Sequence, residues 1–418
     1  MRKKVFLKGP VMSQSGYGHH ARTVAKALKQ REDIFDVYIE NINWGRTGWQ
    51  WEDSPFRRWV DDKIRKSATY SVERDGPLDI SLQVTIPNEW QKIAQVNIGV
   101  TAGIETTKVS GEWISKGSVM DKIIVVSNHA KQTYEKTVVK AQTPDGKVFD
   151  YSIKTPIEVV NYPVIDCDTL EIPGFNPDTD FNFLCVSQWG PRKNFNNTIS
   201  WWVEEFKNEN VGLIIKTNHI NNCILDHSHT SNALKNLLNN YPDRKCKVYL
   251  LHGDLKREQM SWLYRQKNVK ALLNIAHGEG FGLPMFEAAQ ASLPVVTIGW
   301  SGQLDFLVHD GKKYFAEVDY TIQPVQKDSV WNGVIEGDSM WAFADKTSYQ
   351  KRIRDVFEQH AKYKRTSKKL QKIVSEKFAE EKINKQFVKH VFDEEVFEIE
   401  SWLMQVGSES EEEIVEHD

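Results

Sequence analysis

Three glycines and two glutamates lie close together in the segment HGEGFGLPMFEAAQASLPVV, residues 277–296. Because Gly278, Gly280 and Gly282 carry no Cβ, backbone N–H groups at this turn can approach a ligand closely. The apolar, alanine-rich run that follows predicts a helix beginning near Leu283, and the N-terminus of a helix carries a partial positive charge. The glycines and the helix start together predict a turn that binds phosphate.

The two glutamates of this segment, Glu279 and Glu287, would repel a phosphate, so we expect hydroxyl groups as their partners. A carboxylate accepts hydrogen bonds from two adjacent hydroxyls, as in the ribose of a nucleotide or in a hexose or pentose attached to it. For Glu287 alone, an exposed glutamate on a capped helix is the favoured interpretation. For the segment as a whole, the pattern favours a sugar-nucleotide site.

An alternation of apolar strands and amphipathic helices predicts an α/β fold that positions this turn. The chain begins with the strand-like run KKVFLKGP, a glycine loop, and a helix in which Ala21, Val24, Ala25 and Leu28 fall at helical spacing. Buried strands are predicted later in FNFLCV, VGLIIKT, CKVYLLHG and VKALLNIA. In a parallel sheet the C-terminal ends of such strands lie along one edge, and the glycine-rich turn follows the last of them.

The length of 418 residues predicts two domains of ordinary size. A stretch rich in Pro, Asp, Asn and Gly at residues 161–180 is the predicted linker. We therefore expect an N-terminal Rossmann-like domain at residues 1–163 and a second one at residues 164–345. Charged helices are predicted at residues 346–405, and the acidic tail at residues 406–418 is typical of a solvated chain end.

The composition, with 40% apolar and 27% charged residues, is typical of a globular protein. The sparse cysteines form no CxxC pair, which favours a reduced cytosol. The sequence has neither the apolar core of a signal peptide nor a run long enough to predict a transmembrane segment, so we expect a cytoplasmic protein. Residues 1–150 carry a small excess of Lys and Arg, which suits an anionic partner.

The segment from Glu279 to Glu287 resembles the signature of the retaining nucleotide-sugar glycosyltransferases of family four (glycosyl transferases group 1). This resemblance implies the GT-B fold, in which two Rossmann-like domains face a cleft and C-terminal helices cross back to the N-terminal domain. It extends over about residues 5 to 390. Further stretches similar to the family are SGYGHHAR, IGVTAGIETTKVSGEW, VVSNHAKQTYEKT, VSQWGPRKN and WSGQLDFL.

Carried over to this sequence, the resemblance implies that Arg192 and Lys193 neutralise the diphosphate of the donor as it departs. Fixed cations in a closed cleft stabilise the charge that develops on the leaving oxygen, and no metal is then required. The alternative for the two cations is a solvated basic loop. Glu279 would hold hydroxyls of the donor sugar and Glu287 those of the ribose. No cofactor is implied beyond the nucleoside diphosphate sugar itself.

The family also implies donor-binding roles for glycine-containing turns in both halves of the chain. In the second half these residues are Gly280, Phe281, Gly282 and Leu283. The amides of the last two would lie at the phosphates. In the first half, Gly16 and Gly18 would let a loop of the N-terminal domain close over the donor.

One departure from the family concerns the loop GVTAGIETTK. Many members place a histidine here, near the reacting carbon, and this sequence has none. Glu105 and Thr106 are the polar candidates that remain. Glu105 would either contact a sugar or brace the loop, and the sequence favours neither.

Two other functions and two kinds of acceptor stay open at the level of sequence. A sugar-nucleotide 2-epimerase shares the GT-B fold, and a non-catalytic module that binds sugar nucleotides or nucleic acid belongs to another class. One kind of acceptor is a hydroxylated base in DNA, because the Trp-rich stretch 41–59 either packs or offers a stacking platform. The other kind is an acceptor that is not a nucleic acid, such as a polysaccharide, a lipid-linked sugar or a protein. The stretch CILDHSHTS matches no zinc spacing and is interpreted as a solvated loop.

Overall fold

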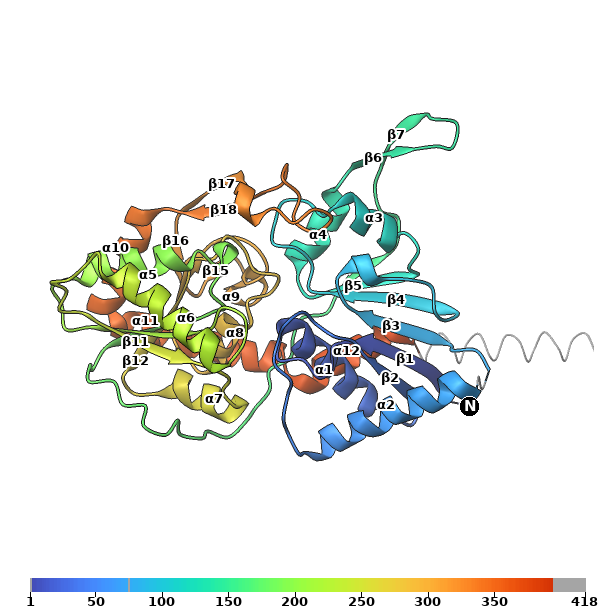
Figure 1. Ribbon diagram of the computed structural model, residues 1–418, viewed down its shortest axis with the longest axis horizontal. Helices are drawn as coiled ribbons and strands as arrows, with labels where there is room; N and C mark the ends of the chain where they lie inside the picture. The colour runs from blue at the N-terminus through green and yellow to red at the C-terminus, as the bar shows by residue number, and fades with distance from the viewer. Residues whose placement is uncertain (1, 74–75, 394–418) are drawn as a thin grey trace, which may run out of the picture.

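Two parallel sheets, each flanked by helices, form the two halves of the chain (Figure 1). The computed structural model describes residues 2–73 and 76–393. The end of the predicted helical segment 346–405 and all of the acidic tail 406–418 therefore lie outside the described residues. Within the described part, no helix is both long and apolar enough to cross a membrane.

The N-terminal sheet has the strand order β2-β1-β3-β4-β5-β8, and every pair in it is parallel. Its strands are β1 (Lys3–Gly9), β2 (Phe35–Asn41), β3 (Ile80–Val84), β4 (Val96–Thr101), β5 (Lys122–Val125) and β8 (Ile157–Val159). Its helices are α1 (Gly16–Lys29), α2 (Pro55–Glu73), α3 (Gly111–Gly117) and α4 (Asn128–Lys136), with a short 3-10 turn η1 (Pro87–Glu89). Strand β3 is buried along its whole length, as expected for a strand with helices on both faces.

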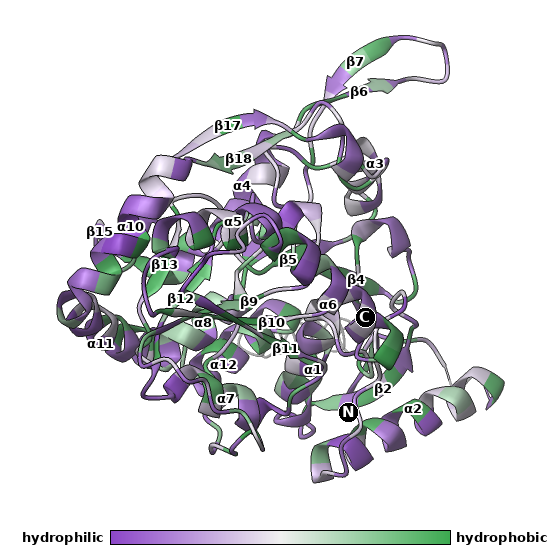
Figure 2. Ribbon diagram, turned by 60° about the vertical axis from the view of Figure 1, so that its left-hand side comes forward, coloured by the Kyte–Doolittle hydropathy of each residue, from purple (hydrophilic) through white to green (hydrophobic). Residues whose placement is uncertain are grey.

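The C-terminal sheet has the order β11-β10-β9-β12-β13-β16 and is likewise parallel. Its strands are β9 (Asn182–Val186), β10 (Gly212–Thr217), β11 (Lys247–His252), β12 (Val269–Asn274), β13 (Val295–Ile298) and β16 (Ala316–Val318). Its helices are η2 (Pro191–Lys193), α5 (Phe195–Phe206), α6 (Ile224–Leu238), α7 (Arg257–Arg265), α8 (Leu283–Gln290) and α9 (Leu304–Leu307). In Figure 2 apolar residues gather on the central strands and on α8, while the outer helix α10 is mostly polar.

The C-terminal helices are α10 (Lys346–Glu358), α11 (His360–Lys377) and α12 (Glu380–Val391). Helix α10 packs against α5, whereas α12 returns to the N-terminal domain and packs against α1. There, Asn384 Nδ2 donates a hydrogen bond to Gln30 Oε1 at 3.0 Å. The predicted α/β architecture, with two Rossmann-like domains and C-terminal helices that cross back, is confirmed. The predicted boundary at 163/164 falls in the extended segment between β8 and β9.

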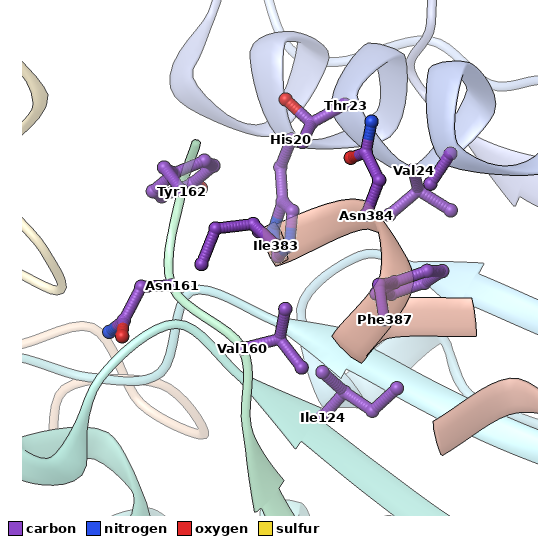
Figure 3. A pocket seen from close by; sticks show the side chains of 11 residues that line it. His20, Thr23, Val24, Ile124, Val160, Asn161, Tyr162, Ile383, Asn384 and Phe387 are labelled. Atoms are coloured by element: carbon purple, nitrogen blue, oxygen red, sulfur yellow. The ribbon is translucent and has the colours of Figure 1, made fainter. Parts of the chain in front are cut away.

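A small pocket lies where α12 crosses α1 and the segment Val160–Tyr162 (Figure 3). His20 lines it and is only 5% exposed. Its Nδ1 atom has no hydrogen-bond partner among the described residues. Burial lowers the pKa of His20 to about 3, so this imidazole is neutral in the folded chain.

Three antiparallel hairpins were not predicted from the sequence. They are β6 (Val139–Gln142) with β7 (Val148–Tyr151), β14 (Val308–His309) with β15 (Lys312–Lys313), and β17 (Tyr320–Pro324) with β18 (Met340–Ala344). The β6–β7 hairpin projects from the N-terminal domain (Figure 1). The connection from β17 to β18 includes the turn η3 (Lys327–Ser329) and reaches across to the N-terminal domain.

Candidate active site

Two cations and two acids from both domains meet between the sheets, and we call these four residues the charged cluster. Lys193 Nζ lies 2.6 and 2.7 Å from the two carboxylate oxygens of Glu279. Arg192 Nη1 lies 2.8 Å from Glu105 Oε1 and 3.6 Å from Glu279 Oε2. Glu105 belongs to the loop after β4, and the other three residues belong to the C-terminal domain. Four of the residues predicted from the sequence are therefore in contact.

The loop that carries the two cations is fixed where β9 ends. Pro191 opens the turn η2, and Asn194 closes it in the left-handed conformation, with φ of 50°. Asn194 Nδ2 donates a hydrogen bond to Ile275 O at 3.2 Å, while the N–H of His277 donates to Arg192 O at 2.9 Å. These bonds join the cation loop to the end of the neighbouring strand β12. A solvated basic loop, the alternative for this segment, does not describe it.

Glu279 is held at three further places, two on its backbone and one on its carboxylate, and the residue is 6% exposed. Its N–H donates to Ser301 Oγ at 2.9 Å, its carbonyl accepts from Gly302 N at 2.9 Å, and its Oε1 accepts from Asn274 Nδ2 at 3.1 Å. Burial alone would raise the pKa of Glu279, but Lys193 and Arg192 outweigh it and the pKa is lowered. The group is therefore an ionised hydrogen-bond acceptor in a fixed position.

The two cations respond differently to the same surroundings. Burial and the nearby Arg192 lower the pKa of Lys193, although Glu279 opposes this shift. Burial also acts to lower the pKa of Arg192, but Glu105 and Glu279 outweigh it and the pKa is raised. Arg192 thus remains a cation throughout, and Glu279 favours the charged form of Lys193.

The glycines of the segment after β12 allow the two domains to touch. A Cβ at Gly278 would lie 2.6 Å from Glu105 O, and one at Gly280 would lie 2.6 Å from Ala102 O. Any larger residue at either place would push the N-terminal loop away. Gly282, the residue just before α8, has φ of 93°, a left-handed conformation that favours glycine.

The remaining residues of this segment have separate surroundings. Phe281 is 3% exposed and packs against Phe286 and Phe306, with ring centroids 5.1 and 5.0 Å apart. Glu287 accepts a hydrogen bond from Tyr264 Oη on α7 at 2.9 Å, and burial raises the pKa of this carboxyl. Phe281 therefore supports the turn through packing, and Glu287 is placed on α8 with a different partner from Glu279.

Comparison with known proteins assigns this site to a family. Residues 170–326, which include the cation loop and the segment with Glu279, match the family described as glycosyl transferases group 1. Over these residues the chain is that of a group 1 glycosyltransferase. It takes its sugar from a nucleotide sugar, and the members of this family are retaining. No curated protein matches the sequence.

Solved structures show that the whole glycosyltransferase has the GT-B fold. Sucrose-phosphate synthase from Thermosynechococcus elongatus is similar with a TM-score of 0.61 and 12% identity, covering 93% of this chain and 98% of that one. A glycosyltransferase from Rickettsia africae gives 0.57 and 13%, over 93% and 98%. HepE from Anabaena, in complex with UDP and glucose, gives 0.56 and 13%, over 93% and 99%. The predicted family and fold are confirmed.

In the glycosyltransferase the first glycine loop lies beside this site without touching the charged cluster. Ser15 Oγ caps α1 by accepting from Gly18 N at 3.0 Å, and a Cβ at Gly18 would lie 2.0 Å from Ser13 O. Gly16 is exposed and has open space around it. Between them, Tyr17 Oη bonds Thr101 Oγ1 at 2.7 Å, next to the loop that meets Gly280.

Several residues that support the site were missed from the sequence. Ser301 belongs to the stretch WSGQLDFL, which was noted as similar to the family but given no role. Asn274 is the last residue of a predicted strand, and this position was the only indication in the sequence that Asn274 could belong to the site. Thr106, the other candidate in its loop, is 1% exposed and donates to Lys108 O at 2.8 Å, so it braces the loop.

No metal centre is found in the described part of the glycosyltransferase, where no three His, Cys, Asp or Glu side chains are grouped to hold an ion. The interpretation of CILDHSHTS as a solvated loop is wrong, because Cys223 caps α6 and the residues after it form the first turns of this helix. Asp226 accepts from the N–H groups of His219 and Ile220 at 3.0 and 2.9 Å, and it lies 2.8 Å from His252 Nε2. Through these contacts, Asp226 connects the first turn of α6 to the ends of β10 and β11.

Proposed function

We propose that this glycosyltransferase transfers a sugar from a nucleoside diphosphate sugar to an acceptor hydroxyl with retention of anomeric configuration. The charged cluster is the observation that supports this proposal, because it places two cations beside a fixed carboxylate between the domains. Arg192 and Lys193 would take the diphosphate. Glu279 would accept hydrogen bonds from the hydroxyls of the donor sugar.

The chemistry requires little more than these charges. The bond from the anomeric carbon to the phosphate oxygen breaks, and the acceptor oxygen bonds to the same carbon on the same face. The acceptor proton passes to the departing phosphate oxygen. Negative charge builds on the diphosphate during this step, and preorganised cations stabilise it by about 3 kcal/mol for each donor of this kind. No protein nucleophile is needed, so the absence of a histidine from the loop of Glu105 is consistent with turnover.

Glu287 is proposed to bind the ribose of the donor. One carboxylate oxygen is occupied by Tyr264 Oη, which leaves Oε1 for a hydroxyl. HepE was solved with UDP and glucose, so UDP-glucose is the first donor to test. The amides of Gly282 and Leu283 at the start of α8 are proposed to face the phosphates.

The acceptor is proposed to bind beside the Trp-rich loop of the N-terminal domain. Trp44 packs against Tyr17 with ring centroids 4.5 Å apart and ring planes at 36°, whereas Trp49 and Trp51 are 53% and 89% exposed. A Cβ at Gly48 would lie 3.3 Å from Asp254 Oδ2, so this loop lies at the boundary of the two domains. Exposed indole rings in that place suit a flat base in DNA or the apolar face of a saccharide ring.

The test is a turnover assay with a panel of nucleotide sugars, each alone, with hydroxymethylated duplex DNA and with simple saccharides. Transfer requires an acceptor and gives a product of retained configuration. Donor conversion without any acceptor would instead identify a 2-epimerase, and binding without donor consumption would identify a non-catalytic module. We expect EDTA to leave the rate unchanged, because Arg192 and Lys193 supply the positive charge.

A further inference from the structure

Residues 320–344 form a hairpin whose tip lies on one domain and whose base lies on the other, and we call them the interdomain strap. Figure 1 shows β17 and β18 along the upper edge of the molecule, with their connection reaching from the C-terminal sheet to α3 and α4. The strap follows β16 in the chain and belongs by sequence to the C-terminal domain. It provides a cross-domain connection separate from α12 and from the segment between β8 and β9.

The tip of the strap is inserted in the core of the N-terminal domain. Val334 is 6% exposed and belongs to the apolar cluster of Trp90, Ile104 and Trp113. Gly333 O accepts hydrogen bonds from Asn88 Nδ2 at 3.1 Å and from Ser110 Oγ at 2.9 Å. An exposed ion pair between Lys108 and Asp338 adds to these contacts. The tip is therefore anchored by both apolar and polar contacts.

The base of the strap is bonded to the segment that carries Glu279. The N–H of Ala342 donates to His277 O at 3.1 Å, and His277 Nδ1 donates to Ala342 O at 2.7 Å. The imidazole stacks on Trp341 with centroids 4.9 Å apart and accepts from Gln326 Nε2 at 3.1 Å. The N–H of His277 also donates to Arg192 O. The strap is therefore connected both to the loop of the two cations and to the segment that carries Glu279.

One strand, β18, thus bonds to both sides of the charged cluster. At Met340 it pairs with Thr107, whose N–H donates to Met340 O at 2.8 Å and whose Oγ1 accepts from Met340 N at 3.1 Å. Thr107 is two residues from Glu105, and His277 is two residues from Glu279. Along a strand, positions 340 and 342 are about 7 Å apart. The strand therefore sets the spacing between the two loops whose acids meet Arg192.

We propose that the interdomain strap is a positioning element of the transfer reaction, which holds the loop of Glu105 against Arg192 and Glu279. This inference rests on the proposed function, because it assigns the strap to the same site. With the tip released, the N-terminal loop leaves the cluster, while the cation loop and Glu279 keep their own contacts within the C-terminal domain. Donor binding is then retained, and the closed arrangement required for transfer becomes less populated.

The test combines an interdomain distance with kinetics in the full chain. Val334→Ser weakens the tip, and Trp331→Ala is the matched control, because Trp331 lies in the same loop with its side chain 59% exposed. Spin labels on α2 and α6, with Cys167 and Cys223 replaced by Ser, report the distance between domains. We expect Val334→Ser to broaden that distance and lower kcat about tenfold, with UDP affinity no weaker than that of the parent chain. Trp331→Ala should change neither quantity.

A second pair of variants avoids the apolar core. Lys108→Asp alone should broaden the distance and lower kcat by a smaller factor, and the double change Lys108→Asp with Asp338→Lys should restore both. A distance unchanged in Val334→Ser, equal losses in Trp331→Ala, or no rescue by the double change would each overturn the inference. If the parent chain consumes no donor, the proposed function fails, but the distance measurement still tests the strap.

Discussion

Replacing Glu105 by Gln should tighten the binding of a nucleoside diphosphate. The Glu105 carboxylate lies 2.8 Å from Arg192 Nη1, and the two side chains are 17% and 29% exposed. A diphosphate that uses Arg192 has to displace this carboxylate or share the cation with it. Glutamine keeps the shape of the side chain and an oxygen that accepts a hydrogen bond, but it removes the competing charge.

The size of the effect follows from the kind of hydrogen bond that is exchanged. A hydrogen bond to a charged group contributes about 1.5–3 kcal/mol, and a neutral one contributes about 1 kcal/mol. The difference of about 1.4 kcal/mol corresponds to about tenfold tighter binding. We expect this gain for UDP, measured by titration calorimetry at fixed ionic strength. Glu105→Asp keeps the charge and should show no gain.

The same variant separates the two roles that the sequence left open for Glu105. If Glu105 braces the loop through Arg192, UDP binding tightens and the rate of the bound complex changes by less than tenfold. If Glu105 contacts a reacting sugar, kcat falls by much more than the change in affinity. Weaker UDP binding by Glu105→Gln would refute the reasoning, because it would mean that the carboxylate does not compete with phosphate.

Four further predictions concern individual residues. Glu279→Ala should lower kcat by about 10²- to 10³-fold, and Arg192→Ala should both weaken UDP binding and lower kcat to a similar extent, as steady-state kinetics would measure. The pKa of His20 is 6.5 in the unfolded chain and about 3 in the folded one. Below pH 6.5 the unfolded chain therefore binds a proton that the folded chain does not, and the free energy of unfolding decreases as the pH falls. Urea unfolding at pH 7 and pH 5 should therefore show a loss of stability that is smaller by about 2 kcal/mol in His20→Gln and unchanged in the exposed His227→Gln. Tyr264→Phe should weaken UDP binding a few-fold if Glu287 holds the ribose, since the carboxylate loses the hydrogen bond that orients it; unchanged affinity would count against that role.

The sequence was sufficient for the architecture and for the C-terminal half of the site. Buried parallel strands are near-continuous apolar runs, so β9 and β12 could be recognised in the sequence. In a parallel sheet the loops after these strands lie along the same edge. Arg192, Lys193 and Glu279 follow those strands directly. Their contact is a consequence of strand order, which local patterns and the family resemblance both indicated.

Features that depend on contacts between the two domains could not be predicted from the sequence. Gly278 and Gly280 were interpreted through a ligand, yet each also lies against backbone of the N-terminal loop, at Glu105 and Ala102. The strap was missed because β17 and β18 alternate weakly, and their pairing is stabilised by His277 and by the core around Val334. No local pattern in residues 320–344 encodes partners that are so distant. The domain boundaries and the donor-binding roles of Gly16 and Gly18 stay predictions.

The charged cluster also indicates which of its acids yields to the donor. Two cations and two carboxylates balance each other in the present arrangement, and a diphosphate brings at least two further negative charges. The Glu279 carboxylate is bonded to Asn274 and Lys193, and Ser301 and Gly302 fix its backbone, so the side chain has several bonds to lose and little freedom to move. The Glu105 side chain is paired with Arg192, and the loop of Glu105 belongs to the other domain. Donor binding should therefore displace Glu105 and leave Glu279 in place for the sugar. Because Thr107 joins the loop of Glu105 to β18, this displacement acts directly on the strap, and the strap limits how far the loop can withdraw.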